Sequence, residues 1–130
     1  MKHTEGFLRL VDDAKSRIRE VTVAETQARL VQNPDAKLID VREDNEFEAA
    51  HAAGATHLGK GIIERDIETA VPDKNTELIF YCGGGYRSAL VADVLQKMGY
   101  TNVWSMAGGW RAWNEAGGEI EKGKPQITQK

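Results

Sequence analysis

The only cysteine of this 130-residue chain, Cys82, stands where reactive chemistry could be placed. It ends the apolar run 77–82, which predicts a buried strand, and Gly83, Gly84 and Gly85 follow it. Glycines can adopt positive φ angles and turn successive backbone N–H groups toward one point. In open α/β sheets, ligands bind beyond the carboxyl ends of the strands. Position and surroundings therefore make Cys82 the candidate reactive residue.

The helix expected after the glycines has two features that favour an anion. It begins at about Tyr86 with no Ser, Thr, Asp or Asn before it, so its first amides lack a side-chain acceptor. Arg87 falls in its first turn, where a cation opposes the helix dipole at a cost of about 0.3–1 kcal/mol. The loop amides, the helix N-terminus and the guanidinium should together favour a thiolate, which makes Cys82 a nucleophile at neutral pH.

Other interpretations of these residues are weaker. A lone cysteine at a strand end can be a small buried hydrophobe, but the glycines, the missing cap and Arg87 coincide within six residues. The Gly-x-x-x-x-Gly-Lys-Ser/Thr pattern of a phosphate-binding loop is absent. His51 and His57 give little support to a Cys–His protease. One cysteine permits neither an internal disulfide nor a cysteine-rich zinc site, and we expect no metal and no cofactor.

The elements that must position Cys82 alternate along the chain. Thr22 and Glu25 form the pattern of a capping box ahead of a helix, and Gly99 is placed to end the helix that follows Cys82. Strands are predicted at 20–22, 37–42, 55–58, 77–82 and 102–106, and helices at 7–18, 23–31, 46–51, 62–70, 86–98 and 110–116. This alternation predicts an α/β fold, with a parallel sheet covered by helices on both faces.

Composition sets the class of protein. Apolar residues make up 41% and charged residues 28%, as is typical of a soluble globular protein, and the length suits one domain. The net charge is −3 and basic residues are scattered, so we expect neither nucleic acid nor a membrane as a partner. The sequence carries no apolar run long enough to span a bilayer and no secretory signal, which makes the cytoplasm the expected location.

Three stretches resemble the rhodanese family. Residues 82–88 resemble its active-site loop, Cys-x-x-Gly-x-Arg/Thr/Ser, and residues 40–55 and 108–117 resemble two further family segments in the expected order and spacing. The resemblance covers about residues 20–121. It leaves an N-terminal amphipathic helix in 1–19, expected to pack on the domain, and a polar tail at 122–130. It implies a rhodanese-like, five-stranded parallel sheet flanked by helices on both faces.

The resemblance also implies a sulfurtransferase reaction. In the family, the cysteine thiolate attacks the outer sulfur of a small-molecule donor, thiosulfate or a persulfide, and holds that sulfur as a persulfide. A thiophilic acceptor then removes it. Because Cys82 has no second cysteine beside it, the acceptor must be external: cyanide, glutathione or another thiol, or a thioredoxin-like protein.

Residue roles follow from the same resemblance. The amides of Gly83, Gly84, Gly85, Tyr86 and Arg87 would cradle the persulfide, and Arg87 and Ser88 would brace the loop. Asp40 and Arg42 match the family's Asp-x-Arg segment, with a structural ion-pair network that includes acids such as Glu48. Lys60, Gly61 and Glu64 would lie near the mouth of the pocket and could line it. Trp110 fits core packing better, although it could also line the pocket.

Gly83 and the length of the loop narrow the choice of substrate. Thiosulfate-specialised members often carry Arg or Lys directly after the cysteine, where this chain has Gly83, so thiosulfate is not singled out as the physiological donor. Some phosphatases and arsenate reductases share this kind of fold, but their loops place five residues between cysteine and arginine. Only four separate Cys82 from Arg87, which suits a sulfur atom better than phosphate. The alternative function is a non-catalytic module that senses sulfur or binds a protein.

Overall fold

The structure is a computed structural model that describes residues 3–123. Its centre is a sheet of five parallel strands in the order β1-β6-β5-β2-β4. The central strand β5 pairs with β2 and β6, with Phe80 opposite Ile39 on one side and Ser105 on the other. The strands are β1 (Glu20–Val21), β2 (Lys37–Asp40), β4 (Thr56–His57), β5 (Leu78–Tyr81) and β6 (Val103–Met106). The predicted five-stranded parallel sheet is confirmed.

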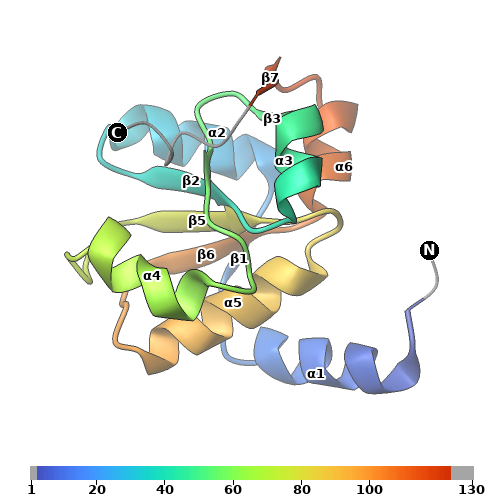
Figure 1. The fold of residues 1–130 in the computed structure, drawn as a ribbon, viewed down its shortest axis with the longest axis vertical. Helices are drawn as coiled ribbons and strands as arrows, with labels where there is room; N and C mark the ends of the chain where they lie inside the picture. Colours follow the sequence, from blue (N-terminus) through green and yellow to red (C-terminus); the bar gives the residue numbers. More distant parts are fainter. Residues whose placement is uncertain (1–2, 124–130) are drawn as a thin grey trace.

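Helices cover both faces of this sheet (Figure 1). On one face, α4 (Ile63–Ala70) and α5 (Tyr86–Lys97) pack on a core that includes Ile39, Phe80 and Val103. On the other face, α2 (Val23–Gln32) and α6 (Gly109–Glu115) enclose Ile79, Tyr81 and Met106. Successive residues of β5 therefore point to opposite faces, and all four are buried, as expected for a central parallel strand.

The N-terminal helix α1 (Glu5–Lys15) lies against the outer side of α5 (Figure 1). Its buried side chains are Val11 and Ala14. Just beyond the helix, Arg17 donates hydrogen bonds of 2.9 and 2.8 Å to the carboxylate of Asp93 on α5. This ion pair lowers the pKa of Asp93 through its hydrogen bonds, against the effect of burial. Apolar contact and charge together attach α1 to the helix that begins at the reactive loop.

Some element boundaries follow the sequence and others do not. The capping box at the start of α2 is present, with Glu25 N donating to Thr22 Oγ1 at 3.0 Å, and Gly99 has the positive φ of a helix terminator. Helix α3 spans Asp44–Ala49, two residues earlier than predicted: a capping box of Glu43 and Glu46 begins it, and it ends before His51, which begins a strand. This strand, β3 (His51–Ala52), pairs antiparallel with β7 (Ile120–Glu121), a ribbon that the sequence did not predict. Residues 124–130 of the expected tail lie outside the described residues.

Among residues 3–123, no helix combines the length and the apolar character that crossing a membrane requires.

Candidate active site

Cys82 directly follows β5, and backbone amides converge on its sulfur. The side chain is 1% exposed. Its Sγ accepts hydrogen bonds from Gly85 N at 3.2 Å and from Ser88 N at 3.4 Å. Ser88 is the third residue of α5, so the sulfur stands where the side-chain oxygen of an N-cap residue would otherwise accept. The helix dipole and both donors favour negative charge on the sulfur.

The loop keeps this shape because its carbonyl groups are held by a second helix. Trp110 N donates to Cys82 O at 2.7 Å, and Arg111 N donates to Gly83 O at 3.2 Å. Both donors belong to the first turn of α6, whose amides have no intrahelical partners. With the carbonyls directed toward α6, the loop amides are left to face the sulfur.

Two glycines allow the two helices to approach this closely. Gly109 has φ +53°, and a Cβ added there would collide with Cys82 O. Gly85 has φ +98°, and a Cβ added there would stand 3.1 Å from Gly108 N. Both conformations lie in the left-handed region that side chains disfavour. Gly85 and Gly109 are therefore required both by their positive φ angles and by the close approach of the reactive loop to the start of α6.

A buried pair of hydroxyl groups extends from the sulfur into the sheet. Ser88 Oγ lies 3.7 Å from Cys82 Sγ and 2.8 Å from Ser105 Oγ on β6. If Ser105 donates to Ser88 and Ser88 donates to the sulfur, both hydroxyl hydrogens have acceptors. In that orientation the sulfur accepts, as a thiolate does; a Cys82 thiol can instead donate to Ser88 Oγ, with Ser88 donating to Ser105. Sequence reasoning did not find Ser105, because a serine within a strand carries no pattern of its own.

Arg87 folds back over the loop and is held by an acid. Its Nη1 lies 3.2 Å from Glu46 Oε1 on α3. Its Nη2 lies so close to the loop that a Cβ placed on Gly83 would be 3.3 Å from it. Burial acts to lower the pKa of Arg87, but the hydrogen bond to Glu46 and the charge of Cys82 outweigh it and raise that pKa. For Glu46, burial is outweighed by hydrogen bonds from Glu43 N and Arg87, which lower its pKa. The guanidinium is thus a fixed positive charge beside the loop.

Asp40 and Arg42 form a buried ion pair beside the site. Arg42 Nη2 donates to Asp40 Oδ2 and to Ala50 O, both at 2.7 Å. Asp40 is 0% and Arg42 4% exposed, and the guanidinium lies 4.7 Å from the Trp110 ring centroid. The pair ties the end of β2 to the end of α3. Glu48 is exposed and takes part in no ion pair among residues 3–123.

A pocket of about 810 Å³ opens above the loop. Five of the predicted residues line it: Cys82, Gly83, Gly84, Tyr86 and Arg87. Gly85 and Ser88 are buried beneath, where their amides hold the sulfur. Because Cys82 is almost fully buried and yet reaches the pocket, it forms part of the pocket floor.

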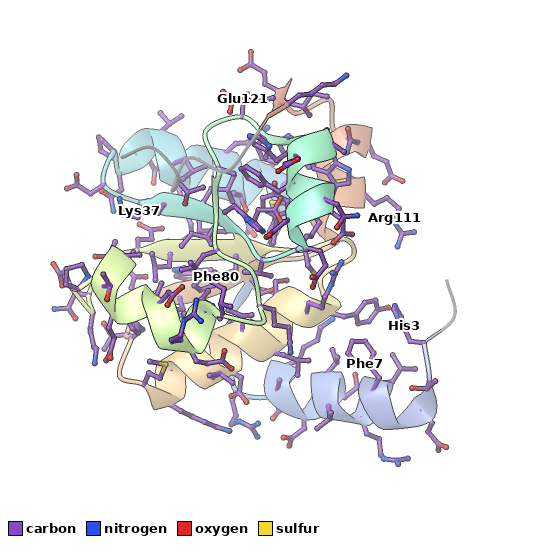
Figure 2. All side chains as sticks on the ribbon, in the orientation of Figure 1. His3, Phe7, Lys37, Phe80, Arg111 and Glu121 are labelled. Atoms are coloured by element: carbon purple, nitrogen blue, oxygen red, sulfur yellow. The ribbon has the colours of Figure 1, made fainter. Side chains whose placement is uncertain are left out.

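The rest of the lining was not predicted. It comes from the start of α1, from α3 and from α6, as His3, Thr4, Phe7, Glu46 and Arg111. Figure 2 shows His3 and Phe7 extending from the N-terminal segment toward the body of the domain, on the side where Arg111 also projects. These residues are far from Cys82 in the sequence, so no local motif connects them to it.

Four residues expected near the pocket mouth do not line this pocket. Lys60 follows β4, where its backbone N donates to Val41 O, while Gly61 and Glu64 are exposed at the start of the α4 region. Trp110 is half-buried and stacks on Tyr81, with ring centroids 6.4 Å apart. The strand order places β4, and with it the segment of Lys60, Gly61 and Glu64, on the opposite side of β2 from the strand that precedes the loop, so these three residues lie away from the pocket. Trp110 packs against the core, the interpretation that the sequence favoured.

Within the described part of the chain, no group of three or more His, Cys, Asp or Glu side chains is arranged to hold a metal ion. The polar groups at this pocket include the Cys82 sulfur, the loop amides, the Arg87 and Arg111 guanidinium groups, the Glu46 carboxylate and the His3 imidazole.

The fold and the loop define a class of protein. The family model for the rhodanese-like domain matches residues 22–116, and the chain belongs to that family. Thiosulfate sulfurtransferase GlpE of Tolumonas auensis is 35% identical over 86 residues, 66% of this chain and 79% of the relative. Thiosulfate sulfurtransferase PspE of Escherichia coli is 37% identical over 70 residues, 54% of this chain and 67% of the relative.

A solved structure resembles nearly the whole chain. It is that of RPA3614 from Rhodopseudomonas palustris, described as a protein of unknown function and possible tyrosine phosphatase. It is 31% identical, with a TM-score of 0.77, and the match covers 93% of this chain and 98% of that one. Unlike the family model, this match extends beyond residues 22–116.

Proposed function

We propose that the protein is a sulfurtransferase that carries a sulfane sulfur on Cys82. The observation that supports this most directly is the convergence of Gly85 N and Ser88 N on Cys82 Sγ, at 3.2 and 3.4 Å. Such fixed donors stabilise an anionic sulfur without reorganising during the reaction. The names of the relatives, thiosulfate sulfurtransferases, agree with this chemistry.

The reaction has two halves. The Cys82 thiolate attacks the outer sulfur of the donor, the donor's sulfur–sulfur bond breaks, and sulfite or a thiolate leaves with the bonding electron pair. Cys82 then carries a persulfide, whose terminal sulfur bears the charge. In the second half, a thiolate or cyanide attacks that terminal sulfur and the Cys82 thiolate leaves. No net oxidation takes place, because the sulfur moves at a constant oxidation state.

The roles of the surrounding residues follow from their positions. The loop amides and Ser88 would hold the charged sulfur, and Arg87 would attract anionic donors while Glu46 keeps it in place. Asp40 and Arg42 would act only through the fold, because they do not line the pocket. The acceptor must come from outside the chain, since Cys82 is its only cysteine.

Steady-state kinetics with two substrates test this function. Thiosulfate as donor and cyanide as acceptor should give thiocyanate with the parallel double-reciprocal lines of a ping-pong scheme. Cys82→Ser should give none. Activity retained by that variant, or lines that intersect, would show that Cys82 does not carry the sulfur.

The possible phosphatase activity in the description of the Rhodopseudomonas palustris protein calls for a second test. Four residues lie between Cys82 and Arg87, one fewer than in the phosphatase loops described above, so the ring of amides is smaller. We expect no turnover of an aryl phosphate such as 4-nitrophenyl phosphate. Measurable, Cys82-dependent release of nitrophenol would contradict the argument from loop length.

A non-catalytic module that senses sulfur or binds a partner is the alternative. The near-complete burial of Cys82 is the observation in its favour, because an acceptor must reach that sulfur. The two hypotheses differ in the second half-reaction. A persulfide that forms but is not discharged by cyanide or by any thiol would favour the module.

A further inference from the structure

We infer that the start of α1 forms a binding wall for the organic part of a thiol or persulfide, one that carries a carboxylate and an apolar group. This rests on the proposed sulfurtransferase function and assigns a substrate class to it. The family model begins at residue 22, so α1 lies outside the part of the chain that it matches. His3, Thr4 and Phe7 nevertheless line the same pocket as Cys82.

Three aromatic rings form one side of the pocket. The centroid of the His3 ring lies 4.5 Å from that of Tyr86 and 5.2 Å from that of Phe7, and the Phe7 and Tyr86 centroids are 6.2 Å apart. Tyr86 belongs to the reactive loop, so the rings connect α1 directly to the residues around the sulfur. Lys15 on the same helix lies 5.4 Å from the Tyr86 ring centroid, which further fixes that ring. These ring faces offer contact to an apolar group.

Two cations stand near the loop, and they are not equivalent. Arg87 is paired with Glu46 at 3.2 Å. Arg111 is exposed and forms no ion pair with any residue in the range 3–123. A Cβ placed on Gly84 would lie 3.7 Å from Arg111 Nη2 and 3.6 Å from the nearest atom of the Tyr86 ring, so both side chains adjoin the loop at Gly84. A carboxylate entering beside the aromatic wall would therefore meet the Arg111 guanidinium at the loop.

The size of the pocket agrees with an organic ligand. Its volume of about 810 Å³ lies in the range of about 300–1,000 Å³ found for sites that hold small organic molecules. Thiosulfate, a compact dianion, would fill little of it and would gain nothing from the aromatic wall. Gly83 also leaves the position after the cysteine without the cation that thiosulfate-specialised members often carry.

The chemistry of such a ligand is balanced. A persulfide anion RSS⁻ gives its outer sulfur to the Cys82 thiolate and leaves as RS⁻, so one sulfur–sulfur bond forms as one breaks. In the opposite direction, RS⁻ takes the sulfur from the Cys82 persulfide and becomes RSS⁻. The same wall would therefore bind the organic group R both in the persulfide donor and in the thiol acceptor.

Discharge of the loaded protein by matched thiols tests the inference. The full chain is loaded with thiosulfate, excess donor is removed, and 2-mercaptoethanol, mercaptoacetate or 2-mercapto-3-phenylpropanoate is added. Loss of the added sulfur is followed by mass spectrometry. Each rate constant is divided by that of the same thiol with free cysteine persulfide, because thiols differ in nucleophilicity. The corrected constants report binding to the pocket.

The phenyl-bearing thiol should discharge the protein about tenfold faster than mercaptoacetate, as expected for an apolar group in a fitting pocket. Phe7→Ala should bring this ratio close to one. Arg111→Ala should lower the ratio of mercaptoacetate to 2-mercaptoethanol by about fivefold, the upper range for an exposed ion pair. The matched control is Leu10→Ala, because Leu10 lies on the same helix at 61% exposure and outside the pocket, and it should change neither ratio.

Three results would overturn the inference: a wild-type phenyl ratio near one, a Phe7→Ala ratio equal to that of wild type, or equal losses in Leu10→Ala. If thermal unfolding shows that Phe7→Ala does not fold, Phe7→Leu replaces it. The leucine keeps apolar volume but loses the ring contacts, so it should lower the ratio of the phenyl-bearing thiol to mercaptoacetate in part. An unchanged ratio there counts against the wall. Failure of the proposed function looks different, since neither the wild type nor any variant would then take up sulfur from thiosulfate or from a persulfide donor.

Discussion

Replacing Gly85 by alanine separates the role of the loop amide from the cost of the backbone. Gly85 has φ +98°, and for an L-residue the left-handed region costs about 1–2 kcal/mol. The added Cβ would also stand 3.1 Å from Gly108 N, so the loop must shift away from α6. That shift moves Gly85 N, which donates to Cys82 Sγ at 3.2 Å. We expect persulfide formation to slow about tenfold or more, because the shift also displaces the loop amides that would hold the charge developing on the terminal sulfur of the persulfide.

The matched control is Gly54→Ala. Gly54 has φ +85° but open space around its Cβ position, and it lies far from the loop in the sequence. Urea denaturation should show a loss of about 1–2 kcal/mol in Gly54→Ala and a larger loss in Gly85→Ala. A quenched time course by mass spectrometry should show slow persulfide formation only in Gly85→Ala. Equal rates in Gly85→Ala and wild type, or equal slowing in both variants, would refute the reasoning.

Three further variants test the supporting structure by urea denaturation. Arg42→Ala leaves the Asp40 carboxylate buried without its partner and should cost about 3–5 kcal/mol; a loss below 1 kcal/mol would contradict the buried ion pair. Thr22→Ala removes the cap of α2 and should cost about 1 kcal/mol without slowing sulfur uptake. Glu46 has its pKa lowered from 4.5 in the folded protein, so its charged form stabilises the fold above that pH and the contribution is lost as the pH falls through the folded pKa. Glu46→Gln should therefore lose less stability than wild type upon acidification below pH 4.5, and an identical acid profile would exclude a role for the ion pair with Arg87.

Much of the fold could be predicted because its signals are local. Apolar runs of strand length, the capping box at Thr22 and the terminator Gly99 each act within a few residues, and the alternation of strands and helices fixes a parallel sheet. The ribbon of β3 and β7 escaped prediction for the opposite reason. Neither strand carries a run of β-branched or aromatic residues, and their pairing joins His51 to Glu121, which are far apart in the sequence.

The site divides in the same way. The sulfur, its amides and Arg87 lie within seven consecutive residues, so composition and position suffice to propose them. Glu46 and Arg111 reach the pocket only through the packing of α3 and α6, and Phe7 reaches it only because α1 lies along α5. An amphipathic pattern shows that α1 must pack on something, but it does not indicate which surface, so its contribution to the pocket could not be inferred.

The most direct test of the account is the mass of the protein between the two half-reactions. After incubation with thiosulfate and removal of the donor, the wild-type chain should gain one sulfur, about 32 Da, on the peptide that contains Cys82, and cyanide should remove it. Cys82→Ser should gain nothing under the same conditions. A wild-type chain that stays unmodified with thiosulfate and with a persulfide donor, or a sulfur found on the Cys82→Ser variant, would contradict the claim that Cys82 carries sulfur.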